Sequence, residues 1–173
     1  LPSNYSAQEQ GKATSGAART LLATELMELE RYSEAATELE AVINSGEYAL
    51  LDDYAAVFDS DNENNQELIE GTYGLSSMYM YLFAPWNAGP ELLGHAQQIA
   101  RTGMNIPTAD LINSFEEGDE RKSLIDLSYI DEINGSYNGN IVPINKKFWD
   151  LDHSIQYQTG TNFPLIRYPH VLL

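Results

Sequence analysis

The sequence predicts a mainly α protein in which one helical hairpin precedes a long irregular region with short strands. Apolar residues recur at helical spacing in both halves of residues 11–46, which favours two packed helices. Over residues 75–106 no period is sustained, and Gly, Pro and aromatic residues become frequent. We therefore expect residues 1–74 to hold the hairpin with a short helix and strand. Residues 75–173 are expected to form an irregular, aromatic-rich, ligand-binding region of the same domain.

The predicted hairpin has two apolar stripes and clear end signals. We expect the first helix to run from about Gly11 to Glu30 and the second to begin at an N-cap on Ser33. Gly46 is placed to end the second helix, because glycine adopts a left-handed cap without steric cost. A short helix over 52–58 follows. The apolar stripes consist of Leu22, Leu26 and Leu29 in the first helix and Ala35, Leu39, Val42 and Ile43 in the second.

The close approach of the two helices is predicted by the spacing Tyr32-x-x-Ala35-x-x-x-Leu39, which places a small residue between them. This pattern resembles one tetratricopeptide-type repeat. A single repeat does not bury its stripes by itself, because such units rely on about three neighbours for a continuous core. Either the rest of the chain covers the hairpin, or the hairpin belongs to a larger helical scaffold.

Composition excludes several classes of function. The 173 residues carry 26 acidic and 9 basic side chains, a formal net charge of −17. Such a surface repels phosphate, which argues against nucleic-acid binding and against docking on anionic lipid. The absence of cysteine excludes disulfides and thiol chemistry. No apolar run approaches the roughly 20 residues of a membrane span.

Short elements are also predicted beyond the hairpin. Residues 67–74 read as a strand, and Thr108 is a suitable N-cap for a short helix over 107–115. Proline interrupts the apolar segments 141–151 and 162–173. These two segments suit edge strands or extended connections, because proline donates no ladder hydrogen bond.

Four segments in this order and spacing resemble the SusD/RagB family of glycan-binding outer-membrane lipoproteins from Bacteroidota. They are residues 11–58, DSDNENNQELIEGTYG (59–74), PTADLINSFEEGDERK (107–122) and NFPLIRYPHVLL (162–173). The hairpin alone would match many helical repeats, whereas four segments in register are specific. The residues that fit the family pattern are Pro107, Thr108, Asp110, Leu111, Phe115, Asp119, Arg121, Pro164, Arg167 and Tyr168.

The resemblance implies a SusD-like scaffold that captures oligosaccharides without catalysis and passes them to a SusC-type TonB-dependent transporter. It implies no cofactor, and a surface-exposed location on the outer membrane through a lipid anchor. Family members are longer and carry further helical hairpins, so we expect this chain to be an excerpt. The chain opens with Leu rather than Met, and its anchor is expected upstream.

The candidate ligand platform is the aromatic segment that holds Tyr79, Tyr81, Phe83 and Trp86, followed by Asn87. Sugar rings present flat C–H faces that stack on aromatic rings, while amides bind their hydroxyls. The alternative is that these rings fill core beneath a long loop. The family's glycan contacts come from loops here, so we predict Tyr79, Tyr81, Trp86 and Asn87 as ligand-binding residues.

An acidic loop has part of the spacing of a calcium-binding loop. Asn64 stands where the sixth position requires glycine, and we therefore favour a solvated acidic turn over calcium. No metal site is predicted elsewhere. The residues with calcium-loop spacing are Asp59, Asp61, Glu63, Asn65 and Glu70.

Charged residues outside that loop have structural interpretations. Asp119 and Arg121 are expected to pair across a turn, and Arg167 is expected to bridge a carboxylate or carbonyl within the scaffold. Lys146 and Lys147 lie beside aromatic residues. They could contact a ligand or could equally be a surface pair whose stems cover apolar groups.

Catalysis receives little support. The histidines His95, His153 and His170 show neither metal-ligand spacing nor a neighbouring nucleophile. Glu116 and Glu117 could form part of a glycosidase carboxylate pair, but they lie in a predicted turn. We predict that the protein is not an enzyme. Two alternatives stay open: a helical-repeat adaptor that binds a peptide or protein, and an accessory fragment of a glycoside hydrolase.

Overall fold

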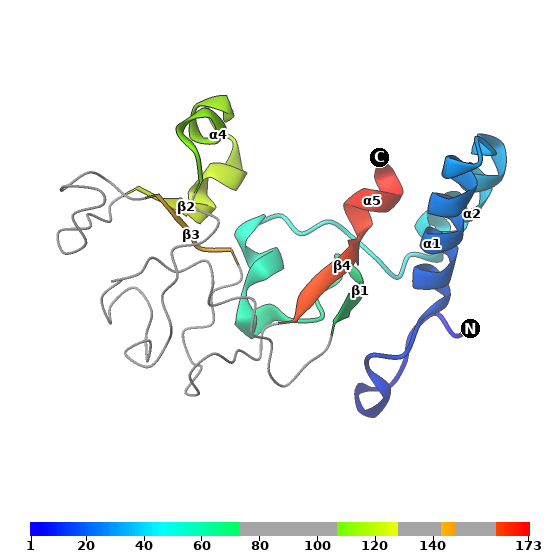
Figure 1. Ribbon diagram of the computed structural model, residues 1–173. Helices are drawn as coiled ribbons and strands as arrows, with labels where there is room; N and C mark the ends of the chain where they lie inside the picture. Colours follow the sequence, from blue (N-terminus) through cyan, green and yellow to red (C-terminus); the bar gives the residue numbers. More distant parts are fainter. Residues whose placement is uncertain (73–106, 128–142, 148–161) are drawn as a thin grey trace. The chain divides into compact units, whose positions relative to one another are not determined.

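The computed structural model describes residues 1–72, 107–127, 143–147 and 162–173 (Figure 1). These residues form helices and short strands, as predicted for a mainly α chain. None of the described helices has the length and apolar composition that a membrane span requires. The chain divides into two compact units: Leu1–Asp52, Asn64–Tyr73 and Asn162–Leu173 form the first, and Asp53–Glu63 and Gly74–Thr161 form the second.

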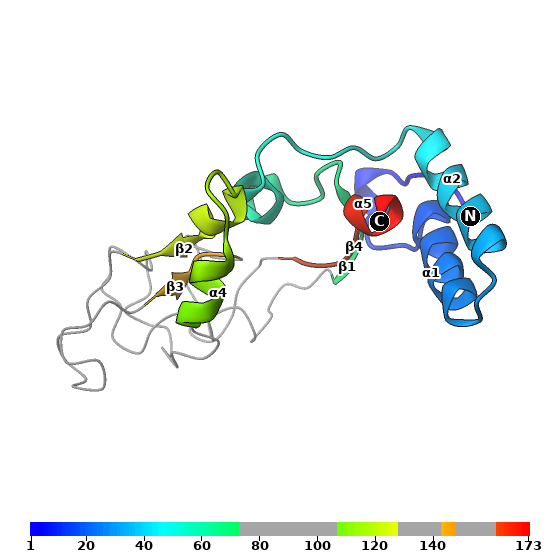
Figure 2. The same cartoon turned by 90° about the horizontal axis from the view of Figure 1, so that it is seen from above.

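The first unit is built on the helical hairpin α1 (Ser15–Glu28) and α2 (Tyr32–Ser45), which lie side by side in both views (Figures 1 and 2). Thr14 caps α1, since its hydroxyl accepts a hydrogen bond from the Ala17 amide at 3.1 Å. Gly46 ends α2 at φ +67°, as predicted. A short helical turn, η1 (Ala7–Glu9), precedes the hairpin.

The predicted hairpin ends need two corrections. The first helix starts at Ser15 rather than Gly11, because the Thr14 side chain provides the N-terminal cap. The second helix starts two residues earlier than a cap on Ser33 would place it, since Arg31 is its N-cap and Glu30 takes φ +57° to turn the chain. The connection between the two helices spans residues 29–31.

The contact between the helices depends on small residues, and here the predicted leucine stripe is partly wrong. Ala23, Leu26 and Ala35 form one buried cluster, with Leu39 packed against it. The predicted small residue at the close approach is therefore confirmed. By contrast, Leu22, Leu29 and Ile43 are 48%, 64% and 39% exposed. Helix α1 buries its Ala- and Thr-bearing face instead of Leu22 and Leu29, and α2 buries Ala35 and Val42 rather than Ile43.

A two-stranded sheet and a final helix complete the first unit. Strand β1 (Leu68–Thr72) pairs antiparallel with β4 (Phe163–Arg167). The predicted strand over 67–74 is confirmed, and of the two alternatives for 162–173, edge strand or extended connection, the structure has a strand. Helix α5 (Tyr168–Leu172) follows β4 and was not predicted; Pro169 in its first turn is a helix-start signal that the reading as an extended segment overlooked. These elements share one core with the hairpin, made of Ala17, Val42, Ile69 and Val171.

A buried ion pair fixes the junction between β1 and β4. Arg167 Nη1 lies 2.8 Å from Glu67 Oε1, and the two side chains are 19% and 5% exposed. The other Glu67 carboxylate oxygen accepts a hydrogen bond from the Leu51 amide at 3.3 Å. The predicted bridge from Arg167 to a scaffold carboxylate is confirmed.

The second unit contains short elements. Thr108 caps α4 (Ala109–Ser114) by accepting from the Leu111 amide at 3.2 Å, as predicted. Asp119 caps η6 (Glu120–Leu124) and lies 2.6 Å from Arg121 Nη2, which confirms their pairing. The remaining elements are the helical turns η2 (Ala55–Phe58) and η3 (Ser60–Asn62) and the antiparallel strand pair β2 (Ile125–Asp126) and β3 (Ile144–Asn145). Of these, η2 packs on η6.

Candidate functional site

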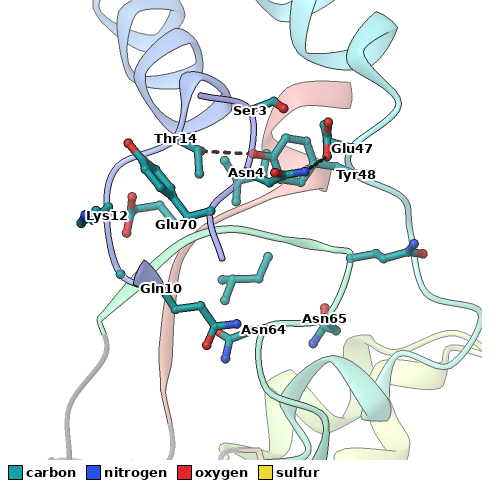
Figure 3. Close-up of a pocket in the computed structure, with 15 residues that line it drawn as sticks. Ser3, Asn4, Gln10, Lys12, Thr14, Glu47, Tyr48, Asn64, Asn65 and Glu70 are labelled. Carbon is teal, nitrogen blue, oxygen red and sulfur yellow. Dashed lines mark hydrogen bonds between the residues drawn. The ribbon is translucent and has the colours of Figure 1, made fainter. Parts of the chain in front are cut away.

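A polar pocket of about 240 Å³ opens in the first unit, next to the start of α1 (Figure 3). Three stretches of chain line it: the segment before α1, the segment after α2 and the segment that leads into β1. The first and second stretches are joined by a hydrogen bond from Asn4 Nδ2 to Glu47 Oε2 at 3.1 Å, drawn dashed in Figure 3. The pocket therefore depends on the fold of this unit and not on any single local motif.

Tyr48 forms a fixed wall of this pocket. Its hydroxyl is 3.2 Å from Thr14 Oγ1, a hydrogen bond drawn dashed in Figure 3. Its ring stacks on Tyr168 with centroids 6.4 Å apart. The ring also lies against the backbone of Gly16, where an added Cβ would come within 2.4 Å of the hydroxyl oxygen. The absence of a side chain at Gly16 is therefore what allows the tyrosine to sit here.

Carboxamides dominate the polar lining of the pocket. Asn65 is held in place, since its Oδ1 accepts a hydrogen bond from the Glu67 amide at 3.1 Å. A carboxamide offers both a donor and an acceptor, as does a hydroxyl group. The five carboxamide side chains that line the pocket are Asn4, Gln10, Asn64, Asn65 and Gln66.

The charge around the pocket is on balance negative. Glu47 and Glu70 line it together with Lys12, whose Nζ is already 2.7 Å from Glu9 Oε1. The pKa of the Glu9 carboxyl is lowered, because side-chain hydrogen bonds from Lys12 and then Ser6 stabilise its charged form. Lys12 is thus paired with Glu9, and the pocket lining holds two carboxylates, Glu47 and Glu70, against this one paired lysine.

The acidic loop has a structural explanation in its own turns. Asp59 caps η3, since its Oδ1 accepts from the Asp61 amide at 2.9 Å, and Asn64 takes φ +57°. Within residues 1–72, 107–127, 143–147 and 162–173, no group of three or more acidic or histidine side chains could hold a metal ion. These contacts support the interpretation of the loop as an acidic turn.

The predicted ligand platform lies outside the described residues. That holds for Tyr79, Tyr81, Phe83, Trp86 and Asn87, and equally for His95 and His153. The assignment of Tyr79, Tyr81, Trp86 and Asn87 as ligand-binding residues therefore stays a prediction.

The other charged candidates are placed by the structure. Lys147 Nζ lies 4.0 Å from the centre of the Phe58 ring, a contact that fits packing over an apolar surface. His170 Nδ1 accepts from the Arg167 amide at 3.2 Å and so takes part in the cap of α5. Glu116 and Glu117 are exposed in a turn, where the Glu116 carbonyl accepts from the Asp119 amide.

Sequence reasoning did not single out the pocket. Its residues come from separate segments that run from Ser3 to Glu70, and isolated polar residues in a surface segment carry no signal of their own. A partial signal exists at Tyr48, two positions beyond the helix-ending Gly46, but its role becomes visible only beside Gly16.

The fold formed by the α1–α2 hairpin and the β1–β4 strand pair is that of SusD-like proteins. No protein-family model matches the chain. A curated relative, a SusD-like protein from Formosa agariphila, is 23% identical over a match that covers all of this chain and 39% of that protein. The chain thus spans less than half the length of this relative.

Solved structures agree with that comparison. Surface glycan-binding protein A from Bacteroides uniformis superposes with a TM-score of 0.83 at 20% identity, covering 99% of this chain and 39% of that one. Surface glycan-binding protein A from Bacteroides thetaiotaomicron, in complex with laminarihexaose, gives 0.79 at 18% identity, covering 99% and 44%. A SusD superfamily protein from Parabacteroides distasonis gives 0.77 at 23%, covering 99% and 40%. The predicted SusD-like fold and the resemblance to this family are confirmed.

Proposed function

We propose that this protein binds oligosaccharides at the bacterial cell surface without catalysis. The observation that carries the proposal is the SusD-like fold, which the chain shares with surface glycan-binding proteins over 99% of its length. One of those proteins was solved in complex with laminarihexaose. The aromatic segment after β1 adds chemistry that suits the same class of ligand.

The proposed binding residues are Tyr79, Tyr81, Trp86 and Asn87. Aromatic faces gain contact with the C–H faces of sugar rings, and the Asn87 carboxamide can bind hydroxyls on either side of a ring. The first unit supplies a stiff frame beside this segment in sequence, since the packed hairpin and the Glu67–Arg167 ion pair fix the strand that leads into it. A rigid frame reduces the entropy that binding must overcome.

The proposal extends to delivery of the ligand. The bound oligosaccharide would pass to a SusC-type TonB-dependent transporter in the outer membrane, with a lipid anchor holding the whole protein at the surface. No cofactor and no covalent step are required, because capture and release are both non-covalent. Co-purification of the whole protein with such a transporter would support this partnership, and recovery of the protein without one would contradict it.

The binding proposal is tested by titration calorimetry with neutral oligosaccharides, beginning with laminarihexaose. Trp86→Ala should weaken binding about tenfold or more, because a stacked aromatic ring at a binding site contributes strongly. Tyr32→Ala removes an exposed ring on α2 and is the matched control, expected to bind as the parent does.

Two results would overturn the proposal. The first is equal binding by Trp86→Ala and the parent chain, with both folded by circular dichroism. The second is failure of every oligosaccharide combined with capture of a defined peptide, which would favour the helical-repeat adaptor.

A further inference from the structure

We propose that the polar pocket beside α1 is a second carbohydrate site, which takes a single neutral or amino-bearing sugar ring. The lining argues for hydroxyl groups as the ligand's polar atoms. Five carboxamides surround the space, and this group can both donate to one hydroxyl and accept from its neighbour; Asn4 and Asn65 already make hydrogen bonds within the fold, which fix their orientation. Such paired donors and acceptors match the vicinal hydroxyls of a sugar better than they match a charged or purely apolar ligand.

The size of the pocket limits the ligand to one ring. Pockets for drug-sized molecules start at about 300 Å³, and this one measures about 240 Å³. An oligosaccharide would leave most of its length outside. A monosaccharide, or the terminal ring of a longer chain, fills the space available.

The aromatic wall supplies the apolar contact that a sugar ring needs. Tyr5 and Tyr48 both line the pocket and are half-buried. Tyr48 is held by the Thr14 hydroxyl, by Tyr168 and by the backbone of Gly16, so it does not have to be ordered when a ligand binds.

Charge selects among sugars. Glu47 and Glu70 face the pocket, while Lys12 is held by Glu9. An anionic sugar would meet two carboxylates and a lysine already paired with Glu9, whereas a protonated amine on the ring would be attracted by either carboxylate. We therefore expect the order amino sugar, then neutral sugar, then acidic sugar.

This inference is independent of the aromatic segment. It would stand if Trp86 bound nothing, and the proposed function would stand if the pocket stayed empty. The pocket proposal and the proposed function are tested separately, because each site has its own set of variants.

The test is an NMR titration of the 173-residue chain with methyl β-D-glucopyranoside, glucosamine and glucuronate at low salt. For a ligand of this size we expect a Kd of about 1 mM for the neutral sugar. Glucuronate should bind at least about tenfold more weakly than the neutral sugar. The amide shifts should concentrate in residues 3–14, 47–48 and 64–70.

Variants with matched controls test the named contacts. Gln10→Ala and Asn64→Gly should each weaken binding by about 3- to 10-fold, the effect of one lost hydrogen bond. Glycine is chosen at 64 because the residue there takes φ +57°, which glycine adopts without strain. Asn44→Ala removes an exposed carboxamide of α2 outside the pocket and should change nothing.

The charge argument has its own pair of variants. Glu47→Gln keeps the shape and the acceptor for Asn4 but removes one charge, so the preference for glucosamine over the neutral sugar should fall. Glu40→Gln, an exposed carboxylate of α2, should leave that preference unchanged.

Three outcomes would overturn the proposal. The first is no shift at these residues up to about 50 mM sugar, far above the expected Kd. The second is an equal response from Asn44→Ala and Gln10→Ala. The third is loss of the pocket shifts in Trp86→Ala, which would place the ring at the aromatic segment and support the proposed function alone.

Discussion

Arg167 connects two segments of the first unit that are 100 residues apart in the sequence. Its guanidinium holds the buried carboxylate of Glu67, whose second oxygen accepts from the Leu51 amide. A buried carboxylate stripped of its cation is costly, even where the intact pair adds little net stability. The contribution of Arg167 is therefore best measured by removing it alone.

We expect Arg167→Gln to lower the free energy of unfolding by about 3 kcal/mol, because the Glu67 carboxylate stays buried without its cation. Urea denaturation measures the change. The control is Arg31→Gln, which breaks the exposed pair with Glu34 and should leave the midpoint unchanged. If both substitutions have the same small effect, Arg167 does not hold this junction.

Asp119 is a second residue whose ionisation is tied to local structure. The pKa of its carboxyl is lowered, first by the side-chain hydrogen bond from Arg121 and further by the Arg121 amide and charge. A carboxyl whose pKa is lower in the folded state stabilises the fold above its unfolded pKa of about 3.9. That stabilisation is lost as the pH falls through the lower, folded value.

Arg121→Gln should therefore raise the pKa of Asp119 toward its ordinary range, and the cap on η6 should be lost at a higher pH. A pH titration of the Asp119 carboxyl carbon by NMR measures the midpoint. Lys122→Gln removes a neighbouring exposed charge and is expected to move it much less. An identical midpoint in the parent and in Arg121→Gln would show that the pair does not form in solution.

At the scale of elements, the start of helix α1 leaves space for the ring of Tyr48. Gly16 is the second residue of α1, and alanine is ordinarily favoured over glycine in a helix by up to about 1 kcal/mol. An alanine Cβ there would approach the Tyr48 hydroxyl to 2.4 Å and a ring carbon to 2.6 Å. Overpacking of this kind costs about 1–3 kcal/mol, and the ring is held on its other sides. The clash should outweigh the helix preference.

We accordingly expect Gly16→Ala to destabilise the protein by about 1 kcal/mol and to become neutral or stabilising when combined with Tyr48→Leu. Chemical denaturation of the four members of this cycle gives the coupling. Gly46→Ala is the matched control, because its cost comes from φ +67° with nothing within 4 Å. Its effect should be the same in both backgrounds. An equal cost of Gly16→Ala in both would rule out the tyrosine as the cause.

The elements that the sequence predicted well are those with local signals. Helical spacing gave the hairpin, Gly46 its end, and Thr108 the start of α4. The exposed Leu22 and Leu29 were misplaced, because apolar spacing alone does not tell which face small residues such as Ala23 will occupy. The packing of α1 against α2, and not the apolar spacing along the sequence, decided which face of α1 is buried.

The site could be predicted less completely than the fold. The pocket depends on Asn4 meeting Glu47 and on Gly16 making room for Tyr48, contacts between segments that no local pattern connects. The aromatic segment around Trp86 was found from composition and from the family resemblance. Its part in binding stays a prediction for the experiments above.

The whole molecule carries a large excess of negative charge. Acidic side chains outnumber basic ones 26 to 9. Within the described residues, five basic side chains already form ion pairs: Lys12, Arg19, Arg31, Arg121 and Arg167. Few basic partners are therefore left for the remaining acidic side chains. Like charges lie closer together in the folded chain than in the unfolded one, and their repulsion opposes folding.

Screening that repulsion should therefore stabilise the protein. Raising NaCl from about 0.01 M to about 1 M shortens the Debye length from about 30 Å to about 3 Å. If screening contributes about 1 kcal/mol, the thermal midpoint rises by about 2–4 °C for a chain of this size. Most of the rise should come below about 0.3 M, since screening saturates whereas salting-out by excluded ions continues to grow. A midpoint that is flat or falls across this range would mean that attractive pairs, rather than the acidic excess, dominate the electrostatics of the fold.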